Sequence, residues 1–553
     1  MTEAAERSRP LARAAGSSRV VAAGILASRS LGLIREMLLA ALAGVGLAND
    51  VVQVVMRGPN ILQNLLGEQA LSASFIPIYS RMLAEGRRSE ARRFAGAVFG
   101  LLALVAGAVA FGLILIAPAW VTVIATGLRS RPEAFALAVT GTRILLPMTA
   151  ILVLSAWCLS VLNSHRRFFL PYFAPVLWNV SLVVALAALA WRVDRPGARL
   201  VVLTVAVAAL IGAVLQLAVQ VPLALRMNGG LDPRPSLEAP GVRPAIRAFL
   251  PALLGRGSVQ LSSYLDIYLA LFLAAGGASA LGFAQRLYLL PVALFGTAFA
   301  VVELPEVSRL DPRDGAGAAF SRLRSAIAQV GFLTVPSAVG FLAVGWLLVA
   351  AMYQRWEFGV VDTWLVYWVL AAYSLGLVAA TTSRLLQNLF YAGQDTATPA
   401  KRGFLRVLVQ GAVGGAAMLW LERYRVVDVI GGGDDQTLRL GAVGLALGSA
   451  VAAWVELGAL QVALRRRSGD PAADGAPRAD IPWRRLVLFT SIALAAAVLA
   501  GGVWLLARDL PTLSTAVLVL PTFVAAYLGI AAWSRLPEMV AFRIRLRPTR
   551  RRG

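Results

Sequence analysis

Several arginines of this chain lie inside long apolar runs, where charged side chains are unusual. Each would cost roughly 2.5–3.5 kcal/mol at the centre of a bilayer, so each must line a polar interior, pair with an acid or reach the water interface. An interior lined by guanidinium groups favours an anion, because guanidinium binds phosphate through two parallel hydrogen bonds and stays charged at physiological pH. These arginines are Arg29, Arg35, Arg57, Arg143, Arg256, Arg286 and Arg384.

The run around Arg57 shows how such an interior is built. Its polar side chains recur at intervals of three and four residues, which places them in one stripe along a helix. The stripe consists of Gln53, Arg57, Asn60, Asn64 and Glu68, and Gly58-Pro59 is expected to bend the helix within it. Another run repeats the pattern in part, with Arg256 followed by Gln260.

The same charged residues also have structural interpretations. Arg29 and Glu36 share one helix face and could form an ion pair that locks helices together. For Arg143 and Arg384, a structural or interfacial role is favoured over ligand binding. Asp266 could pair with a neighbouring arginine, which is the favoured interpretation, or bind a coupling cation.

Composition limits the chemistry further. Of the 553 residues, 58% are hydrophobic and 15% charged, whereas a soluble domain has about 25% charged residues. The single histidine, His165, and the single cysteine, Cys158, cannot form a disulfide, a metal cluster or a His-based catalytic group. We therefore expect no catalytic residue, no metal and no cofactor, and we assign no coupling ion.

The elements that position these residues are apolar runs long enough to cross a bilayer. Fourteen are expected, which predicts an all-α integral membrane protein. The first run begins near Arg19 and is too long for the apolar region of a cleavable signal peptide, and it contains Arg29 and Arg35. The expected spans are 19–45, 50–80, 95–123, 135–162, 171–191, 200–225, 245–274, 278–305, 327–352, 361–390, 403–421, 440–464, 486–507 and 512–534.

The net charge of +23 lies mainly in the loops and tails between these runs. Arginines are concentrated in both terminal tails and in every second loop, which is the positive-inside pattern of a membrane protein rather than a nucleic-acid-binding surface. We therefore expect a multi-pass protein of the bacterial cytoplasmic (inner) membrane with both termini in the cytoplasm. Membrane lipids are expected partners, and nucleic acid is not.

A short internal repeat predicts two lobes. Residues 77–81 read PIYSR and residues 305–309 read PEVSR, and Arg57 and Arg286 precede the two copies at nearly equal distance. Six spans separate the copies, which predicts two parallel six-helix lobes around a central cationic cavity, plus two extra C-terminal helices. The expected divisions are a cytoplasmic basic tail at 1–18, an N-lobe at 19–227, a C-lobe at 242–466, the last two spans at 482–535 and a second basic tail at 536–553.

The motifs of the first two spans resemble a known family. Residues 28–36 read SRSLGLIRE and are followed by Ala48-Asn49-Asp50, and the second span contains RGPN at 57–60, GEQA at 67–70 and FIP at 75–77. Supporting matches are FLP at 169–171, APV at 174–176 with Asn179, YSLG at 373–376, FY at 390–391 and DTATP at 395–399. Over residues 19–535 the chain resembles the MurJ (MviN) family of lipid II flippases, in the multidrug/oligosaccharidyl-lipid/polysaccharide exporter superfamily.

This resemblance implies alternating-access transport of lipid II, an undecaprenyl-diphosphate carrying the peptidoglycan precursor, from the inner to the outer leaflet. It implies functional roles for Arg29, Arg35 and Arg286, a basic position at Arg57, and motif acids at Asp50 and Glu68. Cell-wall synthesis proteins are possible partners. Together with Arg256, these arginines are the expected substrate-binding residues, and the expected polar and acidic cavity residues are Glu36, Asp50, Gln53, Asn60, Asn64, Glu68, Gln260 and Asp266.

The chain departs from the family pattern at two places. The family often has a basic residue where this chain has Gln63-Asn64, and Arg256 could compensate for it. Some members are thought to use a cation site with acidic or Asn ligands on the eleventh helix, but span eleven has no acid before Glu422, so sodium coupling there is not expected.

Other functions remain open at the level of sequence. A flippase for a different undecaprenyl-linked oligosaccharide fits the same residues, whereas a drug/cation antiporter would require buried carboxylates rather than arginines. A polyprenyl-phosphate-dependent membrane glycosyltransferase would need acidic residues in a long loop beside the membrane, and no such loop is evident. A transport-inactive scaffold for cell-wall assembly fits the polar stripe of the second span poorly.

Overall fold

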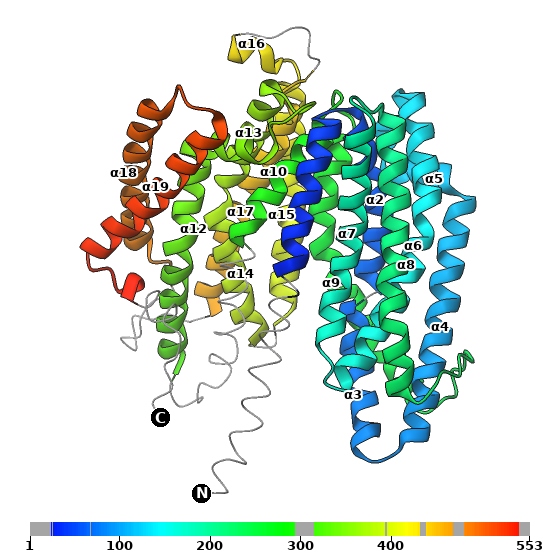
Figure 1. Cartoon of the computed structure of the whole chain (residues 1–553). Helices are drawn as coiled ribbons and strands as arrows, with labels where there is room; N and C mark the ends of the chain where they lie inside the picture. The colour runs from blue at the N-terminus through cyan, green and yellow to red at the C-terminus, as the bar shows by residue number, and fades with distance from the viewer. Residues whose placement is uncertain are drawn as a thin grey trace, which may run out of the picture. The chain divides into compact units, whose positions relative to one another are not determined.

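The structure is a computed structural model, and it describes residues 24, 26–66, 68–292, 315–392, 395–431, 438–467 and 480–540. Helices account for most of these residues (Figure 1). The chain divides into two compact units, unit 1 at Met1–Gln260 and unit 2 at Leu261–Gly553. The lobe boundaries expected from the sequence stay a prediction, and the boundary between the units lies within one long helix, α9.

Unit 1 is a bundle of long apolar helices. The first described helix covers residues 26–43 and is called the first helix below. It is followed by α2 (Leu47–Leu66), α3 (Glu68–Ala84), α4 (Arg88–Leu115), α5 (Ala117–Ile124), the short 3-10 helix η1 (Thr126–Ser130), α6 (Pro132–Ser164), α7 (Phe169–Arg192), α8 (Ala198–Asn228) and α9 (Val242–Ala270). α6 is central, because it packs against α2, α4 and α8.

Aromatic packing joins α3 to α4 and α6 in unit 1. Phe75 stacks on both Tyr79 and Phe94, with ring centroids 5.1 Å apart in each pair. The indole nitrogen of Trp157 donates a hydrogen bond to the carbonyl oxygen of Ala95, 2.9 Å away. All of these side chains are buried, so this cluster fixes one end of the bundle through dispersion as well as burial.

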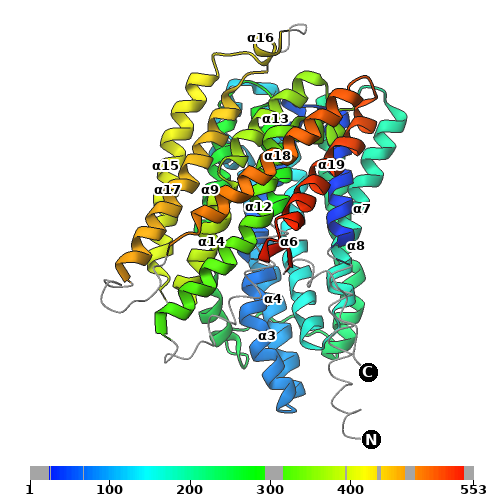
Figure 2. The same cartoon turned by 90° about the vertical axis from the view of Figure 1, so that its left-hand side faces the viewer.

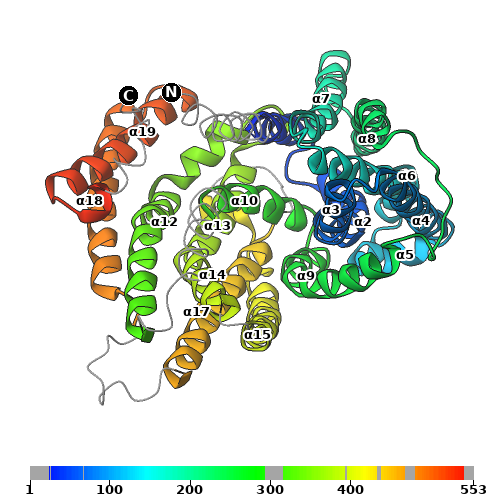
Figure 3. The ribbon, with the colours of Figure 1, turned by 90° about the horizontal axis from the view of Figure 1, so that it is seen from below.

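Unit 2 contains the remaining described helices. They are α10 (Gly277–Pro291), α12 (Gly315–Tyr353), α13 (Val360–Ser374), α14 (Leu377–Ala392), α15 (Ala397–Leu421), α16 (Val426–Ile430), α17 (Gly441–Arg467), α18 (Trp483–Ala507) and α19 (Thr512–Trp533). α15 and α17 run side by side, and α18 and α19 pack on each other and on α12 (Figures 2 and 3). An apolar core of this unit joins α12, α14, α17, α18 and α19.

The expected spans coincide with helices wherever the structure describes them. In the described part of the chain, nine helices are long and apolar enough to cross a membrane, or ten if the bent pair α13 and α14 is one span. The four expected spans outside this group are the first helix, α2 with α3, α9, and α10. These are the helices that carry the five arginines expected to bind the substrate. Polar residues lower the mean hydropathy of α2 and α9, whereas the described part of α10 has only 15 residues, which is shorter than a span. The count of fourteen stays a prediction.

Two expected spans are divided in the structure. The third is divided into α4 and α5 at Ile116, and the tenth bends by 41° between α13 and α14. Pro59 does not interrupt α2, which continues for seven more residues to Leu66. The second copy of the sequence repeat, at 305–309, lies outside the described residues.

Candidate anion-binding site

Arg35 is the best-defined expected site residue, and its guanidinium is held from two sides. Its Nε and Nη2 donate hydrogen bonds to Oε1 of Glu36, at 3.2 and 2.6 Å, and Nη1 donates to Oδ1 of Asn179 at 3.1 Å. Its Cζ also lies 5.0 Å from the centroid of a Trp178 ring. The Arg35 side chain keeps 19% of its surface exposed, so the cation is fixed in direction and is still accessible to an anion.

The first helix approaches α7 closely because small residues lie between the two helices. Gly24, Ser28 and Gly32 recur every four residues, and a Cβ atom at Gly24 would lie 2.8 Å from the carbonyl oxygen of Tyr172. The amide of Asn179 donates to both the carbonyl oxygen and the hydroxyl of Ser28, at 3.2 Å each. Small residues at this spacing permit close helix packing inside membranes. The close packing places Asn179 beside Arg35.

Glu36 has a different partner from the one that the shared helix face suggested. It is 3% exposed, and its Oε1 accepts the bonds from Arg35 rather than from Arg29. Arg29 is exposed, and the ion pair between Arg29 and Glu36 is not formed. The reason is that the long Arg35 side chain bends toward Glu36, the next residue in the chain. The angular positions of residues on an ideal helix do not predict such a contact. Arg29 thus keeps its charge available for a ligand.

α2 is strongly amphipathic, as the polar stripe predicts. Near its start Asp50 and Gln53 are buried, at 2% and 8% exposure, Arg57 is partly buried, and Asn60 is exposed. The described part of the stripe therefore runs from buried Gln53 to exposed Asn60. The side chains of Asn64, Glu68, Arg256 and Gln260 lie outside the described residues, although α2, α3 and α9 carry their backbones.

Unit 2 positions Asp266 and Arg286 on neighbouring helices. Asp266 is 2% exposed; its Oδ2 accepts a hydrogen bond from the Tyr373 hydroxyl at 3.0 Å and its Oδ1 accepts one from Nε2 of Gln410 at 2.5 Å. Tyr373 in turn accepts a bond from Gln285, one residue before Arg286 on α10. Two neutral donors thus hold a buried carboxylate in the interior of the unit.

Arg286 itself is partly buried, and its Cζ lies 5.9 Å from the ring centroid of Phe283. Arg143 on α6 and Arg384 on α14 are both exposed. Within the described ranges, no group of three or more His, Cys, Asp or Glu side chains is placed to hold a metal ion. Guanidinium groups can bind and orient an anion through charge-assisted hydrogen bonds.

Sequence reasoning missed several residues of these arrangements. Trp178 and Gln410 were not singled out, and Asn179 and Tyr373 entered only as parts of motifs. A signal was available for the two amides, because Asn179 and Gln410 are polar residues in largely apolar spans. Intramembrane polar residues are costly unless they are paired, so each one deserves a named partner.

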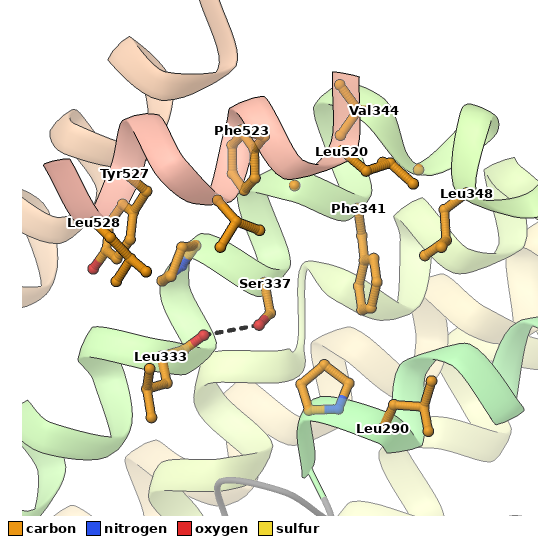
Figure 4. A pocket seen from close by; sticks show the side chains of 15 residues that line it. Leu290, Leu333, Ser337, Phe341, Val344, Leu348, Leu520, Phe523, Tyr527 and Leu528 are labelled. Atoms are coloured by element: carbon orange, nitrogen blue, oxygen red, sulfur yellow. Dashed lines mark hydrogen bonds between the residues drawn. The ribbon is translucent and has the colours of Figure 1, made fainter. Parts of the chain in front are cut away.

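An apolar cavity lies in unit 2 between α12 and α19, next to the end of α10. Its volume is about 420 Å³, and the labelled side chains in Figure 4 point into it from all three helices. Phe341 and Val344 come from α12, Phe523 and Tyr527 from α19, and Leu290 from α10. The only hydrogen bond drawn there is internal to α12, from the Ser337 hydroxyl to the carbonyl oxygen of Leu333 at 2.8 Å. The lining suits a hydrocarbon chain rather than a charged group.

Comparison with known proteins assigns this arrangement to a family. The family model described as "Lipid II flippase MurJ" matches residues 39–525. The chain belongs to the lipid II flippase MurJ family. It is 32% identical to the lipid II flippase MurJ of Burkholderia cenocepacia, over 86% of this chain and 87% of that protein. The MurJ family is one of transporters rather than enzymes, and its members lie in the bacterial inner membrane.

Solved structures show the same fold. A structure titled lipid II flippase MurJ in an inward closed conformation superposes with a TM-score of 0.74 at 20% identity, covering 93% of this chain and 98% of that one. An inward-facing multidrug resistance MATE family transporter of the MOP superfamily gives a TM-score of 0.59 at 15% identity, covering 81% and 96%. The all-helical membrane fold expected for a MurJ family member is thereby confirmed.

Proposed function

We propose that this protein moves lipid II from the inner to the outer leaflet of the cytoplasmic membrane by alternating access. The observation that carries the proposal is membership of the MurJ family over most of the chain. The fold supports it, because both solved structures of that fold are named for conformations that open or close toward the inner side. Lipid II is then the substrate, and the membrane lipids are its surroundings.

The proposed ligand chemistry follows from the arginines. A diphosphate headgroup offers several oxygens to guanidinium groups, and the bonds between them are charge-assisted. Arg29 is exposed and Arg35 is fixed by Glu36 and Asn179, so both present a cation at a defined place on the first helix. We assign them, with Arg57, Arg256 and Arg286, to substrate binding, and the expected polar and acidic residues to the walls around it.

Both termini are proposed to lie in the cytoplasm. In unit 1 the arginine-rich loops that follow α3, α6 and α8 meet at one end of the bundle. Arg92 donates a hydrogen bond to the carbonyl oxygen of Gly229 at 3.2 Å, and the Tyr79 hydroxyl lies 3.1 Å from Nε2 of His165. Arg87, Arg166 and Arg167 are at the same end. A concentration of exposed arginines at one end of a membrane bundle favours the cytoplasmic side.

The proposal is tested in cells depleted of their own lipid II flippase and expressing this protein. An enzyme added outside the cells cleaves only lipid II that has reached the outer leaflet, and the cleaved product is measured. We expect the wild type to restore cleavage and Arg29→Ala to abolish it at equal membrane levels. Arg129→Ala, at an exposed site in the short 3-10 helix η1, is the matched control and should retain activity.

Two outcomes would contradict parts of the proposal. If a well-inserted wild type restores no cleavage, the substrate is another undecaprenyl-linked oligosaccharide, which fits the same diphosphate chemistry. If cleavage survives both Arg29→Ala and Arg286→Ala, the flippase function stands and the assignment of the arginines is wrong.

A further inference from the structure

A second group of cations lies in unit 2, on α14 and α15. Arg384 and Gln387 are one turn apart on α14, Arg402 and Arg406 are one turn apart on α15, and Glu456 is on α17. α14 and α15 both pack on α17, which brings the three helices together (Figure 3). Arg384 lies within electrostatic range of both Arg406 and Glu456. The group therefore combines three guanidinium groups with one carboxylate.

The carboxylate neutralises only one of these cations. Glu456 is 2% exposed, and its Oε2 forms an ion pair with Nη1 of Arg406 at 3.0 Å while Oε1 accepts a bond from Gln387 at 2.9 Å. Among the described residues, Arg384 and Arg402 form no ion pair or hydrogen bond, and Nε of Arg402 and of Arg406 is buried without a partner. The group thus has an excess of positive charge and unused donors.

The depth of the group identifies the kind of anion that fits. α15 has 25 residues and is roughly 37 Å long, so a hydrocarbon core of roughly 30 Å begins a few ångströms inside its ends. Arg402 lies roughly 8 Å and Arg406 roughly 14 Å from the start of α15 at Ala397, and Arg384 lies roughly 12 Å from the end of α14 at Ala392. The three arginines therefore lie between the headgroup boundary and the outer part of the hydrocarbon core. The phosphate of a lipid can reach this depth, whereas a soluble anion is disfavoured there.

We propose that Arg384, Arg402 and Arg406 form a second phosphate-binding site, for the headgroup of a membrane lipid. The unused donors and the excess charge supply the affinity, and Glu456 holds Arg406 in place. Two lipids share the necessary chemistry: an undecaprenyl diphosphate, as in the substrate, and an anionic phospholipid. Occupation by the substrate lipid would place this site on its entry path and rests on the proposed flippase function, whereas phosphate binding itself does not.

The test uses the purified full-length protein in nanodiscs that contain phosphatidylcholine, phosphatidylglycerol and undecaprenyl diphosphate. A photo-crosslinking amino acid replaces Tyr391, which is exposed and lies within electrostatic range of Glu456. The crosslinked lipids are identified by mass spectrometry. We expect enrichment of an anionic lipid, undecaprenyl diphosphate or phosphatidylglycerol, over its share of the membrane, and a loss of this enrichment of about tenfold or more in Arg384→Gln/Arg402→Gln.

The matched control is Arg466→Gln/Arg484→Gln, which removes the same charge from two exposed residues of α17 and α18. It should leave the enrichment unchanged. An undecaprenyl adduct identifies the substrate as the occupant, and a phosphatidylglycerol adduct identifies a resident phospholipid. Adducts in proportion to the membrane composition, or enrichment that persists in Arg384→Gln/Arg402→Gln, would overturn the proposal. Because binding is measured without transport, either result is independent of the flippase assay.

Discussion

The guanidinium of Arg35 donates a hydrogen bond to the side-chain oxygen of Asn179, 3.1 Å away on α7. Asn179 also donates through its Nδ2 to Ser28, so one amide fixes both the backbone of the first helix and the direction of the cation. Its side chain is 6% exposed. This contact makes Asn179 a positioning residue for Arg35 rather than a ligand itself.

Asn179→Ala should therefore lower flipping even though it removes no charge. A hydrogen bond to a charged group contributes about 1.5–3 kcal/mol, so a transport step that needs Arg35 in place would slow about tenfold or more. The measurement is the rate at which lipid II becomes accessible to the external enzyme. Ser181→Ala is the control, because Ser181 lies on the same helix and its hydroxyl donates to Ala208 of α8 instead. A wild-type rate in Asn179→Ala would show that Arg35 needs no support from α7.

The positions of the spans could be predicted from the sequence, because a bilayer requires a minimum length of apolar residues and each run shows it. The division of the third span at Ile116 could not, since a helix break depends on the helices around it. The same limit applies to Arg35. Its charge and its apolar surroundings indicate an unusual residue, but no pattern pairs it with Asn179, which is 144 residues away.

The helix pair α15 and α17 depends on glycines at its contact surface. A methyl group at Gly448 would overlap the backbone of Gly414, and one at Gly444 would overlap the backbone at Ala417 and Met418. Gly448→Ala should destabilise the protein by about 1–3 kcal/mol, because neither backbone can move away without separating the helices. Thermal unfolding of the purified protein in detergent measures this.

Gly458→Ala on the same helix is the control for this substitution. A Cβ atom there would have no neighbour within 4 Å, so the unfolding midpoint should stay the same or rise slightly. Equal midpoints for Gly448→Ala and Gly458→Ala would contradict the close contact between α15 and α17 at Gly448.

His165 gives the protein a dependence of stability on pH. Burial, together with the neighbouring cations of Arg167 and Arg88, lowers the pKa of the His165 imidazole below its ordinary value of 6.5. The folded protein therefore holds this residue neutral, whereas the unfolded chain binds a proton at a higher pH. Its stabilising contribution is complete above pH 6.5 and is lost as the pH falls from there through the lowered pKa.

The measurement for His165 is the thermal unfolding midpoint of the wild type and of His165→Gln on both sides of pH 6.5. Gln keeps a donor for the Tyr79 hydroxyl, 3.1 Å from the imidazole, and does not titrate. We expect the decrease below pH 6.5 to be smaller in the variant. An identical decrease in both proteins would assign the pH dependence to other groups.

Arg406 and Glu456 should contribute to the free energy of unfolding mainly through their ion pair, so that the loss of either partner is costly while the other remains. Removing one partner leaves a charge buried at membrane depth, so Arg406→Met and Glu456→Leu should each destabilise by about 3–5 kcal/mol. The double variant Arg406→Met/Glu456→Leu should lie well above both, because no buried charge is left unpaired. Unfolding midpoints of the four proteins form a double-mutant cycle, and additive losses would show that Glu456 stabilises the helices independently of Arg406. A strong coupling energy would assign the Arg406–Glu456 pair a structural role in stability. Lipid binding would then depend mainly on Arg384 and Arg402, whose guanidinium groups make no ion pair within the described ranges.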